Sequence, residues 1–455
     1  MRTVRESARD VPVIADVDVL VIGSGPGGLG AALAAARAGA NTMLVERFGC
    51  LGGNITVVGV ESIAWYRREK TVDSEGIGIE LEQRAKAMGA TSPEPQSKSE
   101  AINADMFKVV ADRLVAEAGV TPLLHAMAID TVMEGDALRG VIVHSKSGRG
   151  AILAKRIVDA SGDADIAHFS GAPYRMTAKE RMLPVTVMFS VSGVDKKRFL
   201  DYVAANPMKY KDWGLEWDVS KGGKGGKEDE LFSPYLEKPF ALARAAGVIP
   251  PGLKTIGGTW STITDSGEAT YLNMIHLTKY DGTNVWDLTK AEIEGRAQAL
   301  QAIAALNHYA PGFEKARLRT YGTTIGVRDT RKIDGRYNLT EHDVRNQARF
   351  DDSIGIFPEF IDGYGVLVLP TTGRYFEIPY GVLLPQRVEN LLVAGRCIAG
   401  DEISHASVRS MMCCAVTGQG AGVAAAVSIK DGVSLRDVSI VNLQTELLRQ
   451  GVRIH

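Results

Sequence analysis

A glycine-rich turn near the N-terminus carries the clearest chemical signal in the sequence. Gly23, Gly25 and Gly28 form a Gly-x-Gly-x-x-Gly motif between an apolar run, residues 17–22, and an alanine-rich segment that reads as a helix. The first glycine permits a tight turn, the second lets the backbone approach a pyrophosphate, and the third lets the helix pack closely on the strand. Because the helix N-terminus also presents unpaired N–H groups, the turn is predicted to bind the phosphates of a dinucleotide.

Glu46 extends this motif at the end of the next apolar segment, NTMLVE. A carboxylate in that position accepts hydrogen bonds from a ribose diol and would repel the 2′-phosphate of NADP. NAD and FAD remain alternatives for the pocket on the evidence of these residues. A second glycine pair, Gly52 and Gly53, favours FAD, because a longer dinucleotide would pass close to the backbone there.

The glycine motif requires a parallel α/β framework, and both ends of the chain have the pattern of one. Residues 17–46 read as strand, helix and strand, and residues 99–170 continue with a helix and short strands. Near the C-terminus a strand precedes a long helix of small residues, 407–428. We therefore predict an α/β fold in which residues 1–174 and 378–455 form one Rossmann-type domain, with three layers built on a parallel sheet.

Residues 175–377 differ in character and are predicted to form an inserted α+β substrate domain. They contain longer polar connections and the stretch SKGGKGGKEDE, residues 220–230, which is typical of an exposed loop. They also contain an amphipathic helix at residues 291–310, which should end before Pro311. A chain of 455 residues exceeds the usual size of a single hydrophobic core, which agrees with two domains.

Composition and charge indicate a globular protein with a small-molecule ligand. Hydrophobic residues make up 45% and charged residues 23%, and the net charge of -2 creates no strong field for nucleic acid or an anionic membrane. We see no apolar run that approaches the length of a membrane-spanning helix, and no signal-peptide pattern at the N-terminus. We expect a cytoplasmic protein, and a homo-oligomer on base rates alone.

Five stretches together resemble the FAD-dependent oxidoreductase family of glutathione-reductase-like two-domain flavoproteins. They follow the family's order from about residue 15 to residue 430, and they are VIGSGPGGLGAALAAARAGANTMLVER, CLGGN, AKRIVDASGDADIAHFSGAP, TIGVRDTRKIDGRYNLTEHD and VENLLVAGRCIAGDEISHASVRSMMCCAVTGQGAGVAAA. The resemblance implies FAD as the cofactor of the Rossmann-type domain and hydride transfer between FAD and a small organic substrate. Because no histidine lies near the glycine pair in the sequence, we expect FAD to be bound without a covalent link.

The resemblance also assigns cofactor-binding positions along the chain. They are Gly23, Gly25 and Gly28 at the pyrophosphate, Glu46 and Arg47 at the adenosine ribose, Gly52 and Gly53 at the middle of the cofactor, Ala126 and Ala128 beside the adenine, Ser161 and Gly162 in a turn close to the cofactor, and Gly395, Arg396 and Ser410 toward the flavin. The N-terminus of helix 407–428 should then point at the pyrimidine edge of the flavin, where a positive dipole favours the reduced state.

Because a flavin performs the hydride step itself, the protein needs side chains that orient a substrate and handle a proton. His405 is the first candidate for the proton, since we expect it in a polar loop beside the flavin, with ordinary capping bonds as the alternative. Arg409 is a candidate for a substrate carboxylate, for the cofactor phosphates or for a salt bridge. Arg328 and Arg331 should point to opposite faces of a strand, so at most one lines the pocket. Weaker candidates, each more simply explained as structural, are His276, Tyr271 and Tyr321, and Asp329 is expected to pair with one of the arginines.

The four cysteines, Cys50, Cys397, Cys413 and Cys414, are not spaced as metal ligands or as a Cys-x-x-Cys pair, so we expect neither a metal site nor a disulfide framework. Cys413 and Cys414 would point about 100° apart on a helix, which favours small buried residues over a thiol-redox pair. Cys50 lies close to the expected path of the flavin and keeps a redox role as its alternative.

Three other functions stay open as alternatives. They are a flavoprotein whose net reaction is not a redox reaction, such as a hydratase or isomerase, a NAD-binding biosynthetic protein of the same fold, and an electron-transfer protein. The sequence contains one Gly-x-Gly-x-x-Gly motif, so a nicotinamide cofactor has no second motif of this kind to bind. Neither the substrate nor the electron donor or acceptor follows from these motifs.

Overall fold

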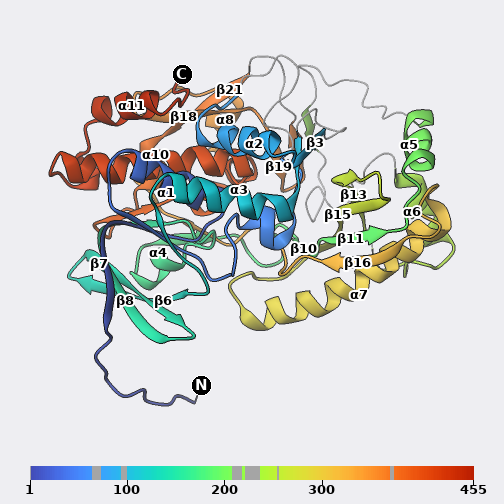
Figure 1. Cartoon of the computed structure of the whole chain (residues 1–455), viewed down its shortest axis with the longest axis horizontal. Coiled ribbons are helices and arrows are strands. Elements are labelled where there is room, and N and C mark those ends of the chain that lie inside the picture. Colours follow the sequence, from blue (N-terminus) through green and yellow to red (C-terminus); the bar gives the residue numbers. More distant parts are fainter. Residues whose placement is uncertain are drawn as a thin grey trace.

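The first predicted strand lies in the middle of the sheet with the most strands, and the glycine motif follows it directly. Residues 127–159 of the same sheet are seen at the lower left of Figure 1. The computed structural model describes residues 2–63, 73–93, 100–206, 218–220, 236–253, 256–368 and 374–455. Within these residues the sheet has seven strands, ordered β5-β2-β1-β8-β7-β6, with β22 also paired to β8. Their bounds are Val13–Ile22 for β1, Thr42–Val45 for β2, Thr121–Leu123 for β5, Met127–Glu134 for β6, Ala137–Ser145 for β7, Gly148–Asp159 for β8 and Leu391–Val393 for β22.

Strand β8 joins the parallel part of this sheet to an antiparallel extension. Strands β1, β2, β5 and β22 run parallel to their neighbours, whereas β7 and β6 run antiparallel. Strand β7 pairs with residues 148–153 of β8, and β22 pairs with residues 157–159. The C-terminal part of the chain therefore extends the sheet that the N-terminal part begins, and the predicted Rossmann-type α/β fold class is confirmed.

Helices α1, Pro26–Arg37, and α10, Met411–Lys430, pack closely against each other. A Cβ atom on Gly418 would lie 2.0 Å from the carbonyl oxygen of Gly27, and one on Gly422 would lie 2.1 Å from that of Ala31. Glycine is therefore required where the two backbones cross. The close crossing fixes the N-terminus of α10 beside the glycine motif.

The predicted helix 407–428 is two helices in the structure. Helix α9 spans Glu402–Val408, and α10 begins at Met411 after a break at residues 409–410. Contrary to the sequence-based expectation, Met411–Lys430 is long and apolar enough to cross a membrane by length and composition. However, 94% of its apolar window is buried inside the protein, as in the core helix of a globular fold.

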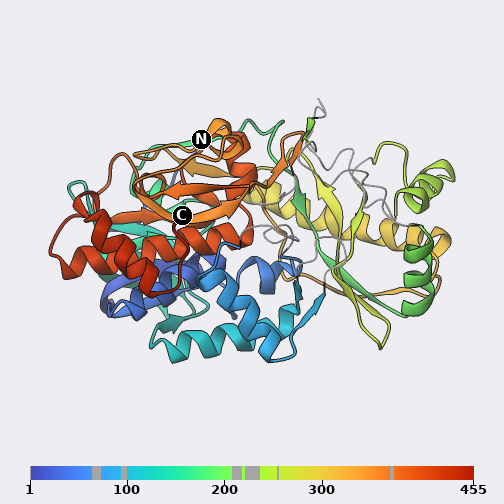
Figure 2. The same ribbon diagram turned by 90° about the horizontal axis from the view of Figure 1, so that it is seen from above.

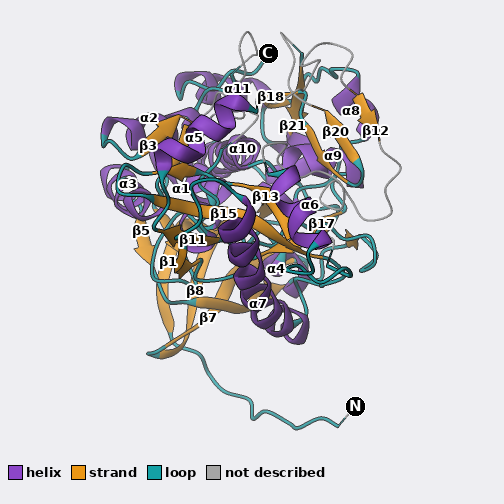
Figure 3. Cartoon of the chain, turned by 90° about the vertical axis from the view of Figure 1, so that its right-hand side faces the viewer, coloured by secondary structure: helices purple, strands orange, loops and turns teal. Residues whose placement is uncertain are grey.

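A second sheet forms the centre of the insertion, which lies beside the first sheet in Figure 2. Its six strands are β10 Val185–Thr186, β11 Phe189–Ser192, β13 Ile256–Thr259, β14 Thr262–Ile263, β15 Glu268–Leu277 and β16 Arg317–Tyr321. Helices α5 Lys196–Ala205, α6 Glu237–Ala245 and α7 Val285–Tyr309 complete it, and α7 crosses in front of the strands in Figure 3.

The long helix of the insertion begins earlier than the predicted residues 291–310. The side chain of Asn284 accepts hydrogen bonds from the N–H groups of Trp286 and Asp287, at 2.9 and 3.3 Å, and so caps α7, which begins at Val285, six residues before the predicted start. The glycine-lysine stretch predicted as an exposed loop lies, beyond Ser220, outside the described residues.

The insertion is also shorter than predicted at its C-terminal end. Its buried core uses residues 185–325, whereas Ile333, Leu339, Ile354 and Phe376 pack in the core of the first sheet. The predicted second boundary at residue 377 is therefore wrong as a division of the two cores. The segment rejoins the first core near residue 330, where β17, Arg331–Ile333, pairs with β9, Tyr174–Met176.

The remaining elements surround the two sheets. They are α2 Ile77–Ala87, α3 Ala104–Glu117, α4 Asp165–Phe169, α8 Glu341–Arg345, α11 Ile440–Arg449, β3 Thr91–Pro93, β4 Glu100–Ile102, β9 Tyr174–Met176, β12 Asp218–Ser220, β17 Arg331–Ile333, β18 Ser353–Pro358, β19 Ile361–Gly363, β20 Val366–Val368 and β21 Tyr375–Pro379.

Candidate functional site

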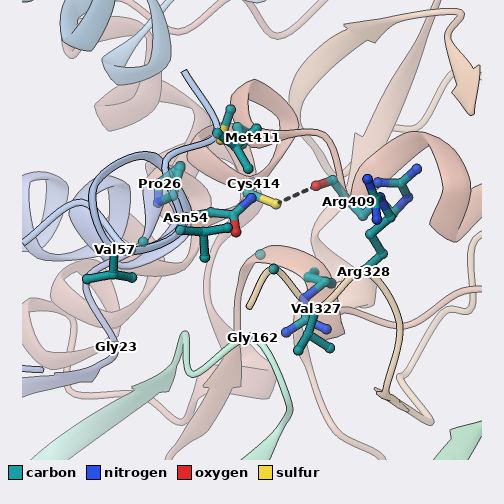
Figure 4. A pocket seen from close by; sticks show the side chains of 18 of the residues that line it. Gly23, Pro26, Asn54, Val57, Gly162, Val327, Arg328, Arg409, Met411 and Cys414 are labelled. Carbon is teal, nitrogen blue, oxygen red and sulfur yellow. Dashed lines mark hydrogen bonds between the residues drawn. The ribbon is translucent and has the colours of Figure 1, made fainter. Parts of the chain in front are cut away.

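A cavity of about 430 Å³ extends from the glycine motif to the sheet of the insertion (Figure 4). One side is lined by the turn after β1, by residues 45–48 after β2, by residues 126–128 at the start of β6 and by residues 160–163 after β8. The other side is lined by strands of the insertion and by residues 324–328. The start of α10 reaches the cavity between the two sides. The cavity therefore lies at the carboxyl ends of parallel strands, where open α/β sheets bind ligands.

Each glycine of the motif has the conformation that its predicted role requires. Gly23 has a φ of +93°, and a Cβ on it would lie 2.5 Å from the carbonyl oxygen of Ala160. A Cβ on Gly28 would lie only 1.7 Å from the carbonyl oxygen of Gly23. Gly25 is different, since a Cβ there would meet no protein atom within 4 Å, although the residue lines the cavity. Its backbone is thus open to a ligand.

The two glycines of the second pair have different places, because only one of them lines the cavity. Gly53 lines the cavity, and a Cβ on it would lie 2.5 Å from the Cα of Gly25. Gly52 has a φ of +107° and donates its N–H to the carbonyl of Ser24, but it does not line the cavity, so it supports the turn instead of contacting a ligand there. Asn54 begins a short π-helix, Asn54–Val58, along the cavity wall.

Glu46 lies at the cavity and is 5% exposed. One carboxylate oxygen accepts hydrogen bonds from the N–H and hydroxyl of Ser24, at 2.9 and 2.6 Å, and the other accepts one from the N–H of Phe48. These bonds hold the carboxylate between the glycine turn and the start of the next segment. Arg47 also lines the cavity and packs over the ring of Phe48, and the N–H of Ala126 bonds to the carbonyl of Glu46.

The turn after β8 brings a carboxylate that the sequence reasoning missed. Ser161 and Gly162 line the cavity as predicted, and Asp163 lines it next to them. The Asp163 carboxylate accepts hydrogen bonds from Thr330 Oγ1 at 2.7 Å and from Arg396 Nη2 at 2.8 Å. Arg396 is therefore held by an acid at the cavity wall. The sequence could have indicated Asp163, because a polar residue after the carboxyl end of a parallel strand commonly faces the ligand site.

The cavity residues fit FAD. Glu46 and residues 126–128 line the cavity together, since the N–H of Ala126 bonds to the carbonyl of Glu46, and the open backbone of Gly25 and Ser410 before α10 line it too. The side chain of Ser410 makes no capping hydrogen bond, so it leaves the first N–H groups of α10 for a ligand. Gly395, with a φ of +83°, also lines the cavity. A long dinucleotide would contact glycine backbones along this path.

The cysteines near this site are not placed as reactive thiols. Cys414 lines the cavity, but burial raises its pKa to about 12, and its Sγ lies 3.4 Å from the carbonyl oxygen of Arg409. Cys413 is buried away from the cavity lining, and burial raises its pKa as well. Cys50 is half-buried, with its Sγ 3.8 Å from Thr56 Oγ1. Within the described residues, no group of three or more His, Cys, Asp and Glu side chains is placed to hold a metal ion.

His405 is not in a loop, and it does not line the cavity. It lies in α9, which begins because the Asp401 side chain accepts the N–H of Ser404 at 2.7 Å. The imidazole is 1% exposed, and its Nε2 lies 3.1 Å from the carbonyl oxygen of Arg328. Burial, followed by the charge of Lys332, lowers the pKa of His405 to about 3. The ring is therefore a neutral, buried group, and its expected place in a polar loop is wrong.

Arg328 and Arg331 were expected on opposite faces of one strand, but β17 begins at Arg331 and Arg328 precedes it. Arg328 lines the cavity, as does Arg409, whereas Arg331 lies behind the wall and bonds through Nη1 to Asp165 and to the carbonyl of Asp163, both at 2.9 Å. Asp329 was expected to pair with one of these arginines, but its carboxylate accepts bonds from Lys332 Nζ and Tyr364 Oη, both at 2.6 Å. Its cationic partner in these contacts is a lysine.

Of the weaker candidates, His276 on β15 lines the cavity. Tyr271 does not, because its ring packs against Gly59, and Tyr321 donates its hydroxyl to the carbonyl of Arg296 on α7. Asn273, also on β15, lines the cavity and was not singled out by the sequence, since asparagine carries no motif of its own.

Known proteins match the segments that line the cavity and also the insertion. The family described as FAD dependent oxidoreductase matches residues 18–447. A thiamine thiazole synthase from Methanococcus maripaludis is 30% identical over 186 residues, which are 38% of this chain and 64% of that protein, so the match spans less than two thirds of that relative's length. A digeranylgeranylglycerophospholipid reductase from Methanosphaerula palustris is 23% identical over 72% of this chain and 87% of that protein.

Among solved structures, a geranylgeranyl bacteriochlorophyll reductase-like protein from Thermoplasma acidophilum shares 13% identity with a TM-score of 0.45, and the alignment covers 95% of this chain and 82% of that one. The family match is the decisive finding, because it extends over nearly the whole chain and includes every segment that lines the cavity. The chain belongs to the FAD-dependent oxidoreductase family, and FAD is its cofactor.

Proposed function

We propose that this protein transfers a hydride between a small organic substrate and FAD that is bound without a covalent link. The observation that carries the proposal is the continuity of the cavity. Its one side has the glycine backbones that fit the cofactor, and its other side has polar side chains of the insertion and of residues 324–328. When bound, FAD supplies the hydride acceptor or donor, and the protein supplies binding and orientation.

The walls of the cavity contain apolar side chains as well as polar groups. Val57, Val58, Met188 and Trp260 line it with apolar surface, which excludes water and strengthens electrostatic contacts. The N-terminus of α10 adds the positive end of a helix of 20 residues. An electron-rich form of the cofactor would be stabilised at that end. The reductase relative from Methanosphaerula palustris, which the match covers over 87% of its length, supports redox chemistry on this scaffold.

His276 is the lining side chain best suited to hold a proton during the reaction. It projects from β15 in the insertion and is 6% exposed. Imidazole is the side chain whose ordinary pKa lies closest to neutral pH, so it can exchange a proton with an alcohol or amine. His405 cannot take this part, because it is buried behind the wall.

The test is an anaerobic reaction of the FAD-bound protein with alcohols, amines and acids, monitored by bleaching of the flavin absorption. The proposal expects bleaching by at least one class and a loss of about 10²-fold to 10⁴-fold in its rate in the His276→Gln variant. Tyr321→Phe is the matched control, since Tyr321 belongs to the same sheet but does not line the cavity. Conversion of a compound without any change in the oxidation state of the flavin would contradict hydride transfer and favour an isomerase or hydratase.

A further inference from the structure

We propose that the substrate is an organic acid whose carboxylate is bound between Arg328 and Arg409, with its apolar part against the apolar wall of the same cavity. This inference rests on the proposed function, because it names the substrate class of that site. Both arginines line the cavity, and Figure 4 shows them across it from Gly23 and Pro26, the turn that fits the phosphates. Their position favours a substrate anion over the cofactor pyrophosphate.

His405 brings the two arginine-bearing segments together. Its Nε2 lies 3.1 Å from the carbonyl oxygen of Arg328, and its own carbonyl accepts the N–H of Arg409 at 3.1 Å. One buried residue therefore bonds to the backbone of both arginines, although they are far apart in the sequence. This arrangement holds the backbones of both arginines beside each other, and Figure 4 shows the two side chains on the same side of the cavity.

The arginine side chains are themselves held in place by the wall. Arg328 Nη1 donates to the carbonyl of Pro184 at 2.8 Å, and Nη2 donates to Asn273 Oδ1 at 3.3 Å. Thr186 Oγ1 lies 3.0 Å from the same Asn273 oxygen, although its single proton has a shorter bond, of 2.7 Å, to the carbonyl of Ile275. Asn273 therefore helps to hold the Arg328 guanidinium group at the wall.

Arg409 retains a donor for which the described residues provide no acceptor. Its Nη2 bonds to the carbonyl of Asp362 and lies 3.5 Å from the Asp362 carboxylate, while its Nε is buried without a hydrogen-bond partner. A buried N–H without an acceptor is costly, and a carboxylate oxygen is its natural partner. Guanidinium groups bind carboxylates through paired, planar hydrogen bonds, which the ammonium group of lysine does not reproduce.

Several acids near this side of the cavity lie beside cationic partners. The Asp362 carboxylate lies 3.5 Å from Arg409 Nη2. Asp163 at the cavity wall pairs with Arg396, and the buried Asp329 pairs with Lys332. An anionic ligand would supply the acceptor that the buried Nε of Arg409 lacks among the described residues. The neighbouring Met188 and Trp260 indicate that the rest of the ligand is apolar.

The experiment measures binding, so it does not depend on turnover. The full-length protein loaded with oxidised FAD is titrated by calorimetry with two probe pairs of similar shape, benzoate against benzamide and acetate against acetamide. We expect at least one carboxylate to bind and its neutral amide to bind about tenfold or more weakly. Arg328→Gln and Arg409→Gln should each weaken carboxylate binding by a similar factor, while Arg139→Gln, on an exposed β-hairpin, should leave it unchanged.

Three outcomes would overturn the inference. They are binding of neither carboxylate, equal binding of acid and amide by the unaltered protein, and a loss of FAD content in the Arg409 variant, which would assign Arg409 to the cofactor. The comparison of acid with amide holds even if a variant fails to fold. Flavin bleaching by a neutral compound without carboxylate binding would refute this inference and leave the proposed function intact, whereas arginine-dependent carboxylate binding without any bleaching would do the reverse.

Discussion

Replacement of Gly25 by alanine separates cofactor binding from folding. A Cβ at this position would meet no protein atom within 4 Å, and the backbone has a φ of -62° and a ψ of -178°, which alanine adopts without strain. The residue is also the N-cap of α1, where alanine is less favourable than glycine by a modest amount. We therefore expect the free energy of unfolding of the FAD-free variant to change by no more than about 1 kcal/mol.

The same methyl group would occupy space in the cavity beside the backbone that fits the pyrophosphate. Loss of one or two charge-assisted hydrogen bonds to a phosphate costs about 1.5–3 kcal/mol each, so FAD affinity should fall by roughly tenfold to several hundredfold. Urea unfolding of the FAD-free protein measures the first quantity, and titration with FAD measures the second.

Gly28→Ala is the contrasting variant in the same turn. Its Cβ would lie 1.7 Å from the carbonyl oxygen of Gly23, which is a backbone atom and cannot move without opening the turn. We expect it to lose about 3 kcal/mol of stability or more, at the upper end of the cost of overpacking. If Gly25→Ala bound FAD as tightly as the unaltered protein, or if it unfolded as readily as Gly28→Ala, the reasoning about the turn would be refuted.

Two further predictions concern buried charges. Burial raises the pKa of Glu61 to about 7 despite hydrogen bonds such as that from Thr270, so the folded state favours the neutral carboxyl group. The stability that comes from this neutral carboxyl group is fully present below about pH 4.5 and is lost as the pH rises through 7. Glu61→Gln should therefore stabilise the protein by up to about 3 kcal/mol at pH 8 and hardly at pH 4. Urea unfolding at both pH values measures this difference. Lys332→Met should cost about 3–5 kcal/mol in urea unfolding, because it leaves Asp329 as an unbalanced buried charge, and Asp329→Asn in the same chain should recover part of the loss. Equal stability of the single and double variants would contradict the assigned pairing.

The part of the site that depends on local sequence could be predicted. The glycine turn, Glu46 and the turn at Ser161 follow directly after strands, so their neighbours along the chain determine their geometry. The strand-helix-strand pattern and the return of the C-terminal segment to the same sheet followed from hydrophobic periodicity. Family resemblance then identified FAD, which the residues alone left beside NAD.

The part that depends on long-range packing could not be predicted. His405 was expected in a loop because its segment is polar, but Asp401 caps a helix there and the imidazole meets the carbonyl of Arg328, 77 residues earlier in the sequence. Asp329 bonds to Lys332 and to the distant Tyr364, and no local pattern indicates that choice. Asn273 is a further example, because only the alignment of β15 with the cavity gives it a role.

The most direct test of the account is the absorption spectrum of the purified full-length protein before and after heat release of its cofactor, followed by anaerobic titration with dithionite. We predict two flavin bands in the native protein, their complete transfer to the supernatant as FAD, and reduction of the bound flavin by two electrons. A colourless protein that also fails to take up added FAD would contradict the central claim that this cavity holds a non-covalent, redox-active FAD.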